Sequence, residues 1–93
     1  MASTNITTTA TQIITGSNNL RAIVFQNPSD EDIYVSPSSD VVATTPSADT
    51  GFLVRAGGDL SLSAEDKGLF GINQNWYAIH GGTGNKVLIH NTL

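Results

Sequence analysis

Residues 20–36 read Leu-Arg-Ala-Ile-Val-Phe-Gln-Asn-Pro-Ser-Asp-Glu-Asp-Ile-Tyr-Val-Ser. Two runs rich in β-branched and aromatic residues flank a Pro-Ser-Asp-Glu loop, whose residues favour tight turns. This pattern predicts a β-hairpin. If Asn27 faces Asp32, then Phe25 faces Tyr34, and both faces of the hairpin are partly apolar. A hairpin alone is marginal in water, so further strands must cover it.

Two more hairpins are predicted downstream. Residues 52–63 hold Phe-Leu-Val-Arg and Asp-Leu-Ser-Leu around Ala-Gly-Gly, and the second run alternates with period two. Residues 75–90 hold two apolar runs around a glycine-rich loop, and pairing His80 with Lys86 puts Tyr77 opposite Ile89 on one apolar face.

The remaining segments give weaker signals. Residues 11–15 predict a first short strand before a Gly-Ser-Asn-Asn turn. The run at 41–44 lies between prolines and suits an edge strand or an ordered loop. A Ser-x-x-Asp pattern at 63–66 permits about one helical turn before Gly68. We therefore expect an all-β protein, a small antiparallel β-sandwich or barrel of about seven to nine short strands.

The organisation expected is one small domain with an extended start. With 93 residues there is room for a single domain, assigned to residues 20–93. Residues 1–19 are assigned to an N-terminal arm and the first short strand, because residues 1–10 are Thr-rich, uncharged and weakly patterned. The alternative for residues 1–10 is an extended strand that orders only against a partner.

The composition of the chain excludes several classes of site and partner. The chain has no Cys, which excludes disulfides and thiolate metal sites. No stretch resembles a signal peptide or a membrane span, so a soluble protein is expected. Net charge is -4 with only four basic residues, scattered along the chain, which argues against nucleic-acid binding.

Candidate catalytic and metal-binding residues are few. In the predicted register His80 and His90 lie about 13 Å apart, at ~3.4 Å per residue, too far to share one metal ion. The three acids at 30–32 could supply oxygen ligands for Ca²⁺, but consecutive side chains do not all point one way. The glycine-rich loop at 81–86 lacks the phosphate-loop spacing. No nucleophile motif is present, so we expect no enzyme, no metal and no cofactor.

One aromatic residue is expected on the surface. Trp76 and Tyr77 are adjacent, so in a strand they point to opposite faces and only one can enter the core of a sandwich. The other suits a protein interface or, less well, stacking on a sugar. We take Trp76 as the candidate for partner binding.

Several runs together resemble a known group of proteins. They are Arg-Ala-Ile-Val-Phe-Gln-Asn-Pro-Ser at 21–29, Ile-Tyr-Val-Ser at 33–36, Val-Arg-Ala-Gly-Gly at 54–58 and Trp-Tyr-Ala-Ile-His-Gly-Gly at 76–82. From about residue 20 to 93 the chain resembles the small all-β virion structural proteins of tailed bacteriophages.

The resemblance implies a non-enzymatic capsid decoration (cement) protein on the virion surface, made in the host cytoplasm. Its implied partner is the major capsid protein or another virion protein, and many members are homotrimers. The N-terminal arm would order against that partner, which makes Ile6, Thr7, Thr8 and Thr9 candidate contacts together with Trp76. Alternatives are a tail or head-tail component, or a host-glycan-binding module that stacks sugars on Trp76 or Tyr34.

Overall fold

The computed structural model describes residues 2–16, 20–39, 41, 52–63 and 74–92. These residues form eight strands and no helix, which confirms the predicted all-β class. The strands are β1 (Ala2–Ile6), β2 (Thr11–Ile14), β3 (Ala22–Gln26), β4 (Ile33–Ser36), β5 (Phe52–Val54), β6 (Asp59–Ser63), β7 (Trp76–His80) and β8 (Lys86–Thr92). The helical turn predicted at 63–66 and most of the run at 41–44 lie outside the described residues.

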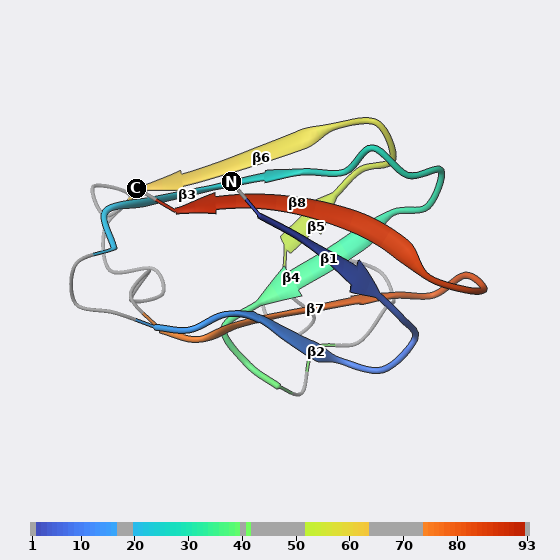
Figure 1. Ribbon diagram of the computed structural model, residues 1–93, viewed down its shortest axis with the longest axis horizontal. Helices are drawn as coiled ribbons and strands as arrows, with labels where there is room; N and C mark the ends of the chain where they lie inside the picture. The colour runs from blue at the N-terminus through green and yellow to red at the C-terminus, as the bar shows by residue number, and fades with distance from the viewer. Residues whose placement is uncertain (1, 17–19, 40, 42–51, 64–73, 93) are drawn as a thin grey trace.

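The strands build a sandwich of two four-stranded sheets, with every pair antiparallel (Figure 1). Sheet A has the order β1-β8-β3-β6, and sheet B has the order β2-β7-β4-β5. Successive strands therefore alternate between the sheets, except for β4 and β5. This strand order is that of an eight-stranded jelly roll.

The three predicted hairpins are wrong as pairings, although their strands exist. β3 and β4 lie in different sheets, and so do β5 and β6, and β7 and β8. Phe25 pairs with Leu60 and His90 in sheet A, whereas Tyr34 pairs with Leu53 and Ile79 in sheet B. Each predicted turn is instead an arch that crosses the sandwich.

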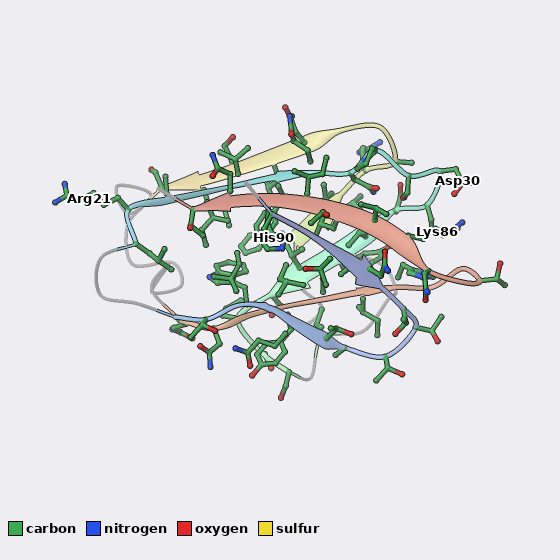
Figure 2. The ribbon with its side chains drawn as sticks, in the orientation of Figure 1. Arg21, Asp30, Lys86 and His90 are labelled. Carbon is green, nitrogen blue, oxygen red and sulfur yellow. The ribbon has the colours of Figure 1, made fainter. Side chains whose placement is uncertain are left out.

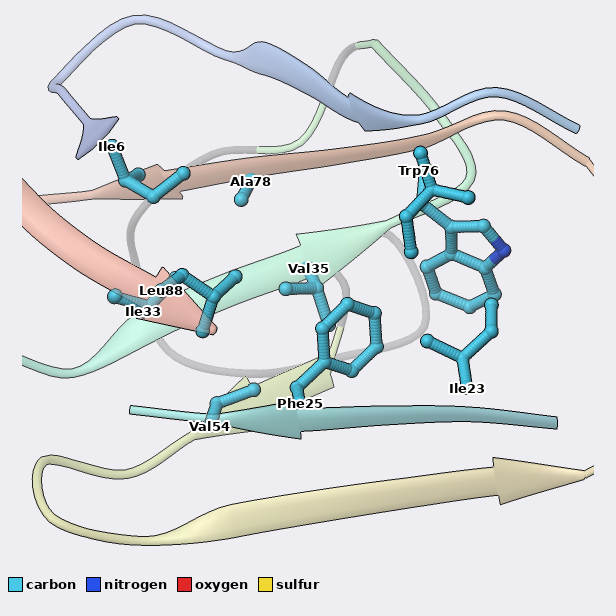
Figure 3. Close-up of a cluster of buried hydrophobic side chains, with 10 residues drawn as sticks. Ile6, Ile23, Phe25, Ile33, Val35, Val54, Trp76, Ala78 and Leu88 are labelled. Atoms are coloured by element: carbon cyan, nitrogen blue, oxygen red, sulfur yellow. The ribbon is translucent and has the colours of Figure 1, made fainter. Parts of the chain in front are cut away.

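The arches have a physical cause. Their loops span residues 27–32, 55–58 and 81–85, longer than the two-residue loops that favour tight hairpins. An arch lets both strands turn an apolar face inward: Phe25 from β3 and Val35 from β4 meet in the core from opposite sheets (Figure 3). In the predicted hairpin, Phe25 and Val35 would lie on opposite faces. Other strands would then have to cover both faces.

The core lies between the sheets and surrounds one aromatic group. Trp76 is fully buried, and its ring centroid lies 5.9 Å from that of Phe25 in tilted geometry (Figure 3). The ring centroid of Phe52 lies 6.2 Å from that of Trp76, also in tilted geometry. Such spacing is typical of favourable aromatic pairs. The other buried members of this cluster are aliphatic: Ile6, Ile14, Ile23, Ile33, Val35, Val54, Ala78 and Leu88.

The strand predicted at 11–15 is present as β2, whereas residues 2–6 of the expected arm form strand β1 of the sandwich. β1 pairs along its whole length with β8, from Ala2 opposite His90 to Ile6 opposite Lys86. Ile6 has no exposed surface and belongs to the core. Burial of a side chain of this size contributes roughly 1.5–3 kcal/mol to the stability of the folded state, in addition to the pairing of β1 with β8.

Candidate functional site

Two of the predicted partner-binding residues are core residues. Trp76 and Ile6 are both fully buried, so neither side chain is on the surface. In the pair Trp76–Tyr77, the outward residue is Tyr77, which is half-buried on the outer face of sheet B. The choice between them depends on which side of β7 faces sheet A, and the local sequence does not carry that information.

The three threonines of the prediction form the β1–β2 connection. The Thr7 hydroxyl accepts a hydrogen bond from Thr9 N at 3.1 Å, and the Thr11 hydroxyl donates to the Thr9 carbonyl at 3.0 Å. The backbone of Thr7 accepts a bond from His80 N at 3.1 Å, which ties this turn to β7. Thr8 and Thr9 are exposed.

Four connections gather at the same end of the sandwich, and we call them the loop end (Figure 1). They are residues 7–10, 27–32, 55–58 and 81–85. Antiparallel pairing explains the grouping, because β1 and β3 both run opposite to β8, and the carboxyl end of β1 lies beside the amino end of β8. In sandwiches the loops at one end commonly carry the binding function.

Asn27 joins two connections of the loop end. Its side chain is buried and donates to the carbonyls of Glu31 at 2.7 Å and Val54 at 2.9 Å, and its amide oxygen accepts from Ser29 N and Oγ. Its backbone N–H donates to the Gly58 carbonyl at 2.9 Å. The sequence signal for this role is the Asn-Pro-Ser triplet, since Asn readily hydrogen-bonds the backbone two residues on.

His80 organises the β7–β8 arch from inside. Its ring is fully buried, and Nδ1 accepts a hydrogen bond from Gly82 N at 3.0 Å while Nε2 lies 2.8 Å from the Gly84 carbonyl. A carbonyl only accepts, so the hydrogen is on Nε2 and the ring is the neutral tautomer. Gly84 has φ +72°, a conformation that suits glycine. His80 therefore has a structural role in this turn.

The three consecutive acids take three different partners. Asp30 pairs with Lys86 at 2.8 Å (Figure 2), the Asp32 carboxylate accepts from Ala56 N at 2.9 Å, and Glu31 lies against Gly82. Among the described residues, no three acidic, His or Cys side chains come together as a metal site. The Ca²⁺ interpretation therefore has no support in this part of the chain.

The Asp30–Lys86 pair lies at the surface, with the Asp30 side chain 85% exposed and the Lys86 side chain 21% exposed. The hydrogen bond from Lys86 and its positive charge lower the pKa of Asp30, and the hydrogen bond to Asp30 raises the pKa of Lys86. An ion pair in solvent contributes little to stability because water and salt screen it. Its role is to hold the start of β8 against the β3–β4 arch.

His90 lies in the other sheet from His80 and has a hydroxyl partner. Its Nε2 is 2.9 Å from Thr4 Oγ1, and burial lowers the pKa of the imidazole (Figure 2). A catalytic triad consists of a hydroxyl, an imidazole and a carboxylate that orients the imidazole. Thr4 and His90 supply the first two groups, but no described carboxylate hydrogen-bonds His90. The pair therefore lacks the geometry of an activated nucleophile.

The outer faces of the two sheets differ in chemistry. On sheet A, β8 directs Val87 and Ile89 outward among Ser and Asn side chains, and Val87 is 40% exposed. On sheet B, Tyr34 lies between Leu53 and Ile79, and Tyr77 follows diagonally.

Hollows on the described surface include two shallow ones at opposite ends of the sandwich. One, of about 380 Å³, lies beside the loop end and includes Gln26, Pro28, Asp59 and Ile89. The other, of about 350 Å³, lies at the opposite end between the edges of β1 and β2. The ionisable side chain that lines the first hollow is Asp59, and the one that lines the second is His90. Neither hollow therefore combines two ionisable side chains, as acid–base catalysis would need.

Comparison with known proteins adds no relative. The chain matches no family model, no curated protein and no solved structure. No described segment is a helix long and apolar enough to cross a membrane.

Proposed function

We propose that this chain is a non-enzymatic structural protein of a bacteriophage virion, a capsid decoration protein that binds and stabilises the mature head lattice. The observation that carries the proposal is the jelly-roll strand order, β1-β8-β3-β6 facing β2-β7-β4-β5. Viral capsid domains use this architecture repeatedly. The link is an analogy at the level of the fold, and it agrees with the motif resemblance to phage virion proteins.

The described chemistry supports a binding role over a catalytic one. The ring of His80 is fully engaged with backbone groups of its own arch, and the His90–Thr4 pair has no orienting carboxylate among the described residues. The loop end, in contrast, is a rigid surface held by hydrogen bonds between connections. A preorganised surface loses little conformational entropy when it binds.

The mechanism is mass action. A module that binds only the mature lattice lowers the free energy of that lattice at every occupied position. The exposed Thr8 and Thr9, in the β1–β2 connection, are the proposed contacts that survive from the sequence prediction. They are uncharged, so their burial at an interface leaves no unpaired ion.

The decisive experiment is quantitative mass spectrometry of purified particles of the phage that encodes the chain. A decoration protein should be present in copy number comparable to the major capsid protein and should be released when the heads are dissociated. A few copies per particle would indicate the tail or head-tail alternative. Absence from the particles would overturn the virion proposal.

A second experiment locates the contact. Thr8→Arg and Thr9→Arg place a large charge on the exposed turn and should reduce binding to undecorated heads at least tenfold, measured by cosedimentation. Thr83→Arg is the matched control, an exposed threonine in the β7–β8 arch of the same loop end. Equal binding by all three variants would exclude the β1–β2 connection as the contact.

The glycan-binding alternative has one specific feature in its favour. Lectin domains also use jelly rolls, and Tyr34 and Tyr77 are half-buried on the outer face of sheet B. Trp76 is no longer a platform, because it is buried. Chemical-shift changes at Tyr34 and Tyr77 on addition of host-surface oligosaccharides would favour this alternative.

A further inference from the structure

The eight described strands form two open sheets with four edge strands, and three of these carry features that discourage pairing with another chain. β2 contains an irregularity between Gln12 and Ile14, β5 has only three residues, and β6 begins with the exposed charge of Asp59. Bulges, short strands and charges are the usual protection of sheet edges.

β1 has none of these protections. Its five residues, Ala-Ser-Thr-Asn-Ile, include no charge, no proline and no glycine, and they pair without interruption with β8. Ser3 and Asn5 are exposed on the outer face of sheet A, and among the described strands β8 is the one that pairs with β1, so β1 lies at the edge of the sheet. Alternate backbone N–H and C=O groups of an edge strand point away from its single neighbour and are available to another strand.

β1 is also held rigidly in place. Ile6 anchors its carboxyl end in the core, and Thr4 Oγ1 contacts His90 Nε2 at 2.9 Å in its middle. An edge strand fixed by its inward side chains presents a preformed template, so a partner strand orders only itself when it binds.

We propose that β1 pairs antiparallel with β1 of a second copy of this chain, about a two-fold axis at Thr4. The register sets Thr4 opposite Thr4, Ser3 opposite Asn5 and Ala2 opposite Ile6. Opposed residues of an antiparallel pair lie on the same face, so the inward row of each copy continues into the inward row of the other. The two copies of sheet A then form one continuous sheet.

A second copy fits this edge because β1 is complementary to itself. The strand is uncharged, so self-pairing opposes no like charges, and Thr–Thr and Ser–Asn are favourable polar neighbours across strands. The exposed Ala2 is covered by the Ile6 end of the other copy. Pairing β1 with the β6 edge of another copy would be head-to-tail and would leave an unpaired edge at each end of an open assembly, whereas the two-fold contact closes.

The test is the solution mass of the intact protein by light scattering over a range of concentrations. A dimer in reversible equilibrium with the monomer is expected. A monomer at every concentration up to the millimolar range, or the trimer that the motif resemblance implies, would overturn the proposal. This measurement needs no virion, so its outcome is separate from that of the proposed function.

Two double variants then test the register. Ser3→Lys with Asn5→Lys sets lysine against lysine twice across the two-fold axis and should raise the dimer dissociation constant about tenfold or more, most strongly at low salt. Ser3→Glu with Asn5→Lys sets opposite charges together twice and should keep dimerisation within about threefold of the original protein. Similar effects of both variants would show that the register is wrong.

Ser61→Lys is the control on the opposite edge of sheet A, an exposed and outward residue of β6. It should leave the dissociation constant unchanged. All variants should keep the thermal midpoint of the unmodified monomer, because these side chains point outward from the sandwich. Dimerisation lost equally in Ser61→Lys would assign the contact to β6 instead.

Discussion

At the scale of single residues, the buried Asn27 side chain joins the β3–β4 connection to the end of β5 by hydrogen bonds. Every polar atom of this uncharged amide has a partner. Its nitrogen donates to one carbonyl of the β3–β4 connection and to one of β5, and its oxygen accepts from Ser29. Buried polar groups that are fully paired specify one arrangement of a loop, because any other leaves them unpaired.

Asn27→Ala should lower the free energy of unfolding by about 2–3 kcal/mol, since it leaves the Val54 carbonyl buried without its amide partner. Urea denaturation followed by Trp76 fluorescence measures the change. Asn85→Ala, at an exposed loop position, is the control and should change stability by less than about 0.5 kcal/mol. Equal effects of the two substitutions would show that the side-chain hydrogen bonds of Asn27 do not stabilise the fold.

His90 makes stability depend on pH in the weakly acidic range. Burial lowers the pKa of its imidazole in the folded state below the ordinary 6.5, so the unfolded chain takes up the proton first as pH falls. The contribution of His90 to stability is therefore complete above about pH 6.5 and is lost as pH drops towards the lowered folded-state pKa.

The urea midpoint of the unmodified protein should accordingly decrease between pH 7.5 and 5.5. His90→Gln, which keeps a hydrogen-bonding group beside Thr4 but does not titrate, should show a smaller decrease over the same interval. Asp30 does not contribute in this interval, because its ion pair with Lys86 lowers the pKa of its carboxyl from an already acidic value. A pH dependence that His90→Gln leaves unchanged would assign the effect to another group.

At the scale of elements, sequence patterns located the strands but not their neighbours. β3, β4 and β7 fall within the predicted runs, and β8 begins as predicted but extends two residues further, to Thr92. Alternation of β-branched and aromatic residues marks a strand wherever it pairs. The same Pro, Ser, Asp and Gly residues serve a hairpin and an arch equally well. Which of the two forms depends on strands far away in the chain, and no local pattern records that.

The candidate site was less predictable than the strands. The sequence marked Thr7–Thr9 but placed them in an arm, because an uncharged Thr-rich start lacks the apolar alternation of a half-buried strand. Only Ile6 indicates that this segment enters a core, and one apolar residue is too weak a signal. The prediction that Trp76 lies on the surface is wrong for a related reason. Both faces of β7 carry large apolar residues, so the sequence does not show which face enters the core.

Deletion of residues 2–10 should destabilise the folded domain. It removes Ile6 from the core and leaves β8 without its neighbour on one side. Loss of the Ile6 side chain alone is expected to cost about 2–5 kcal/mol, a large part of the stability of a small domain.

Thermal unfolding followed by circular dichroism measures this effect, with Ile6→Ala as an intermediate case and the exposed Thr8→Ala as a neutral control. A truncated protein with the same midpoint as the full chain would show that β1 is a dispensable arm after all.

At the scale of the whole molecule, nearly all pairing is between distant residues. Of the pairs of strands joined in the sheets, only β4 and β5 follow each other in the chain, and even they are separated by residues 37–51. Closing long loops costs entropy before any contact compensates for it.

Folding should therefore be slow for a chain of 93 residues. Stopped-flow refolding from urea, followed by the fluorescence of the buried Trp76, should show relaxation times on the order of milliseconds to seconds. Completion within microseconds would indicate that local structure, not the sheet topology, limits the rate.

The central position of β8 in sheet A also matters during synthesis. β1 and β3 both lie directly against β8 (Figure 1). Of the eight described strands, the ribosome makes β1 first and β8 last. Sheet A therefore has no centre until β8 has been synthesised, and the uncharged β1 has no partner strand within its sheet before then.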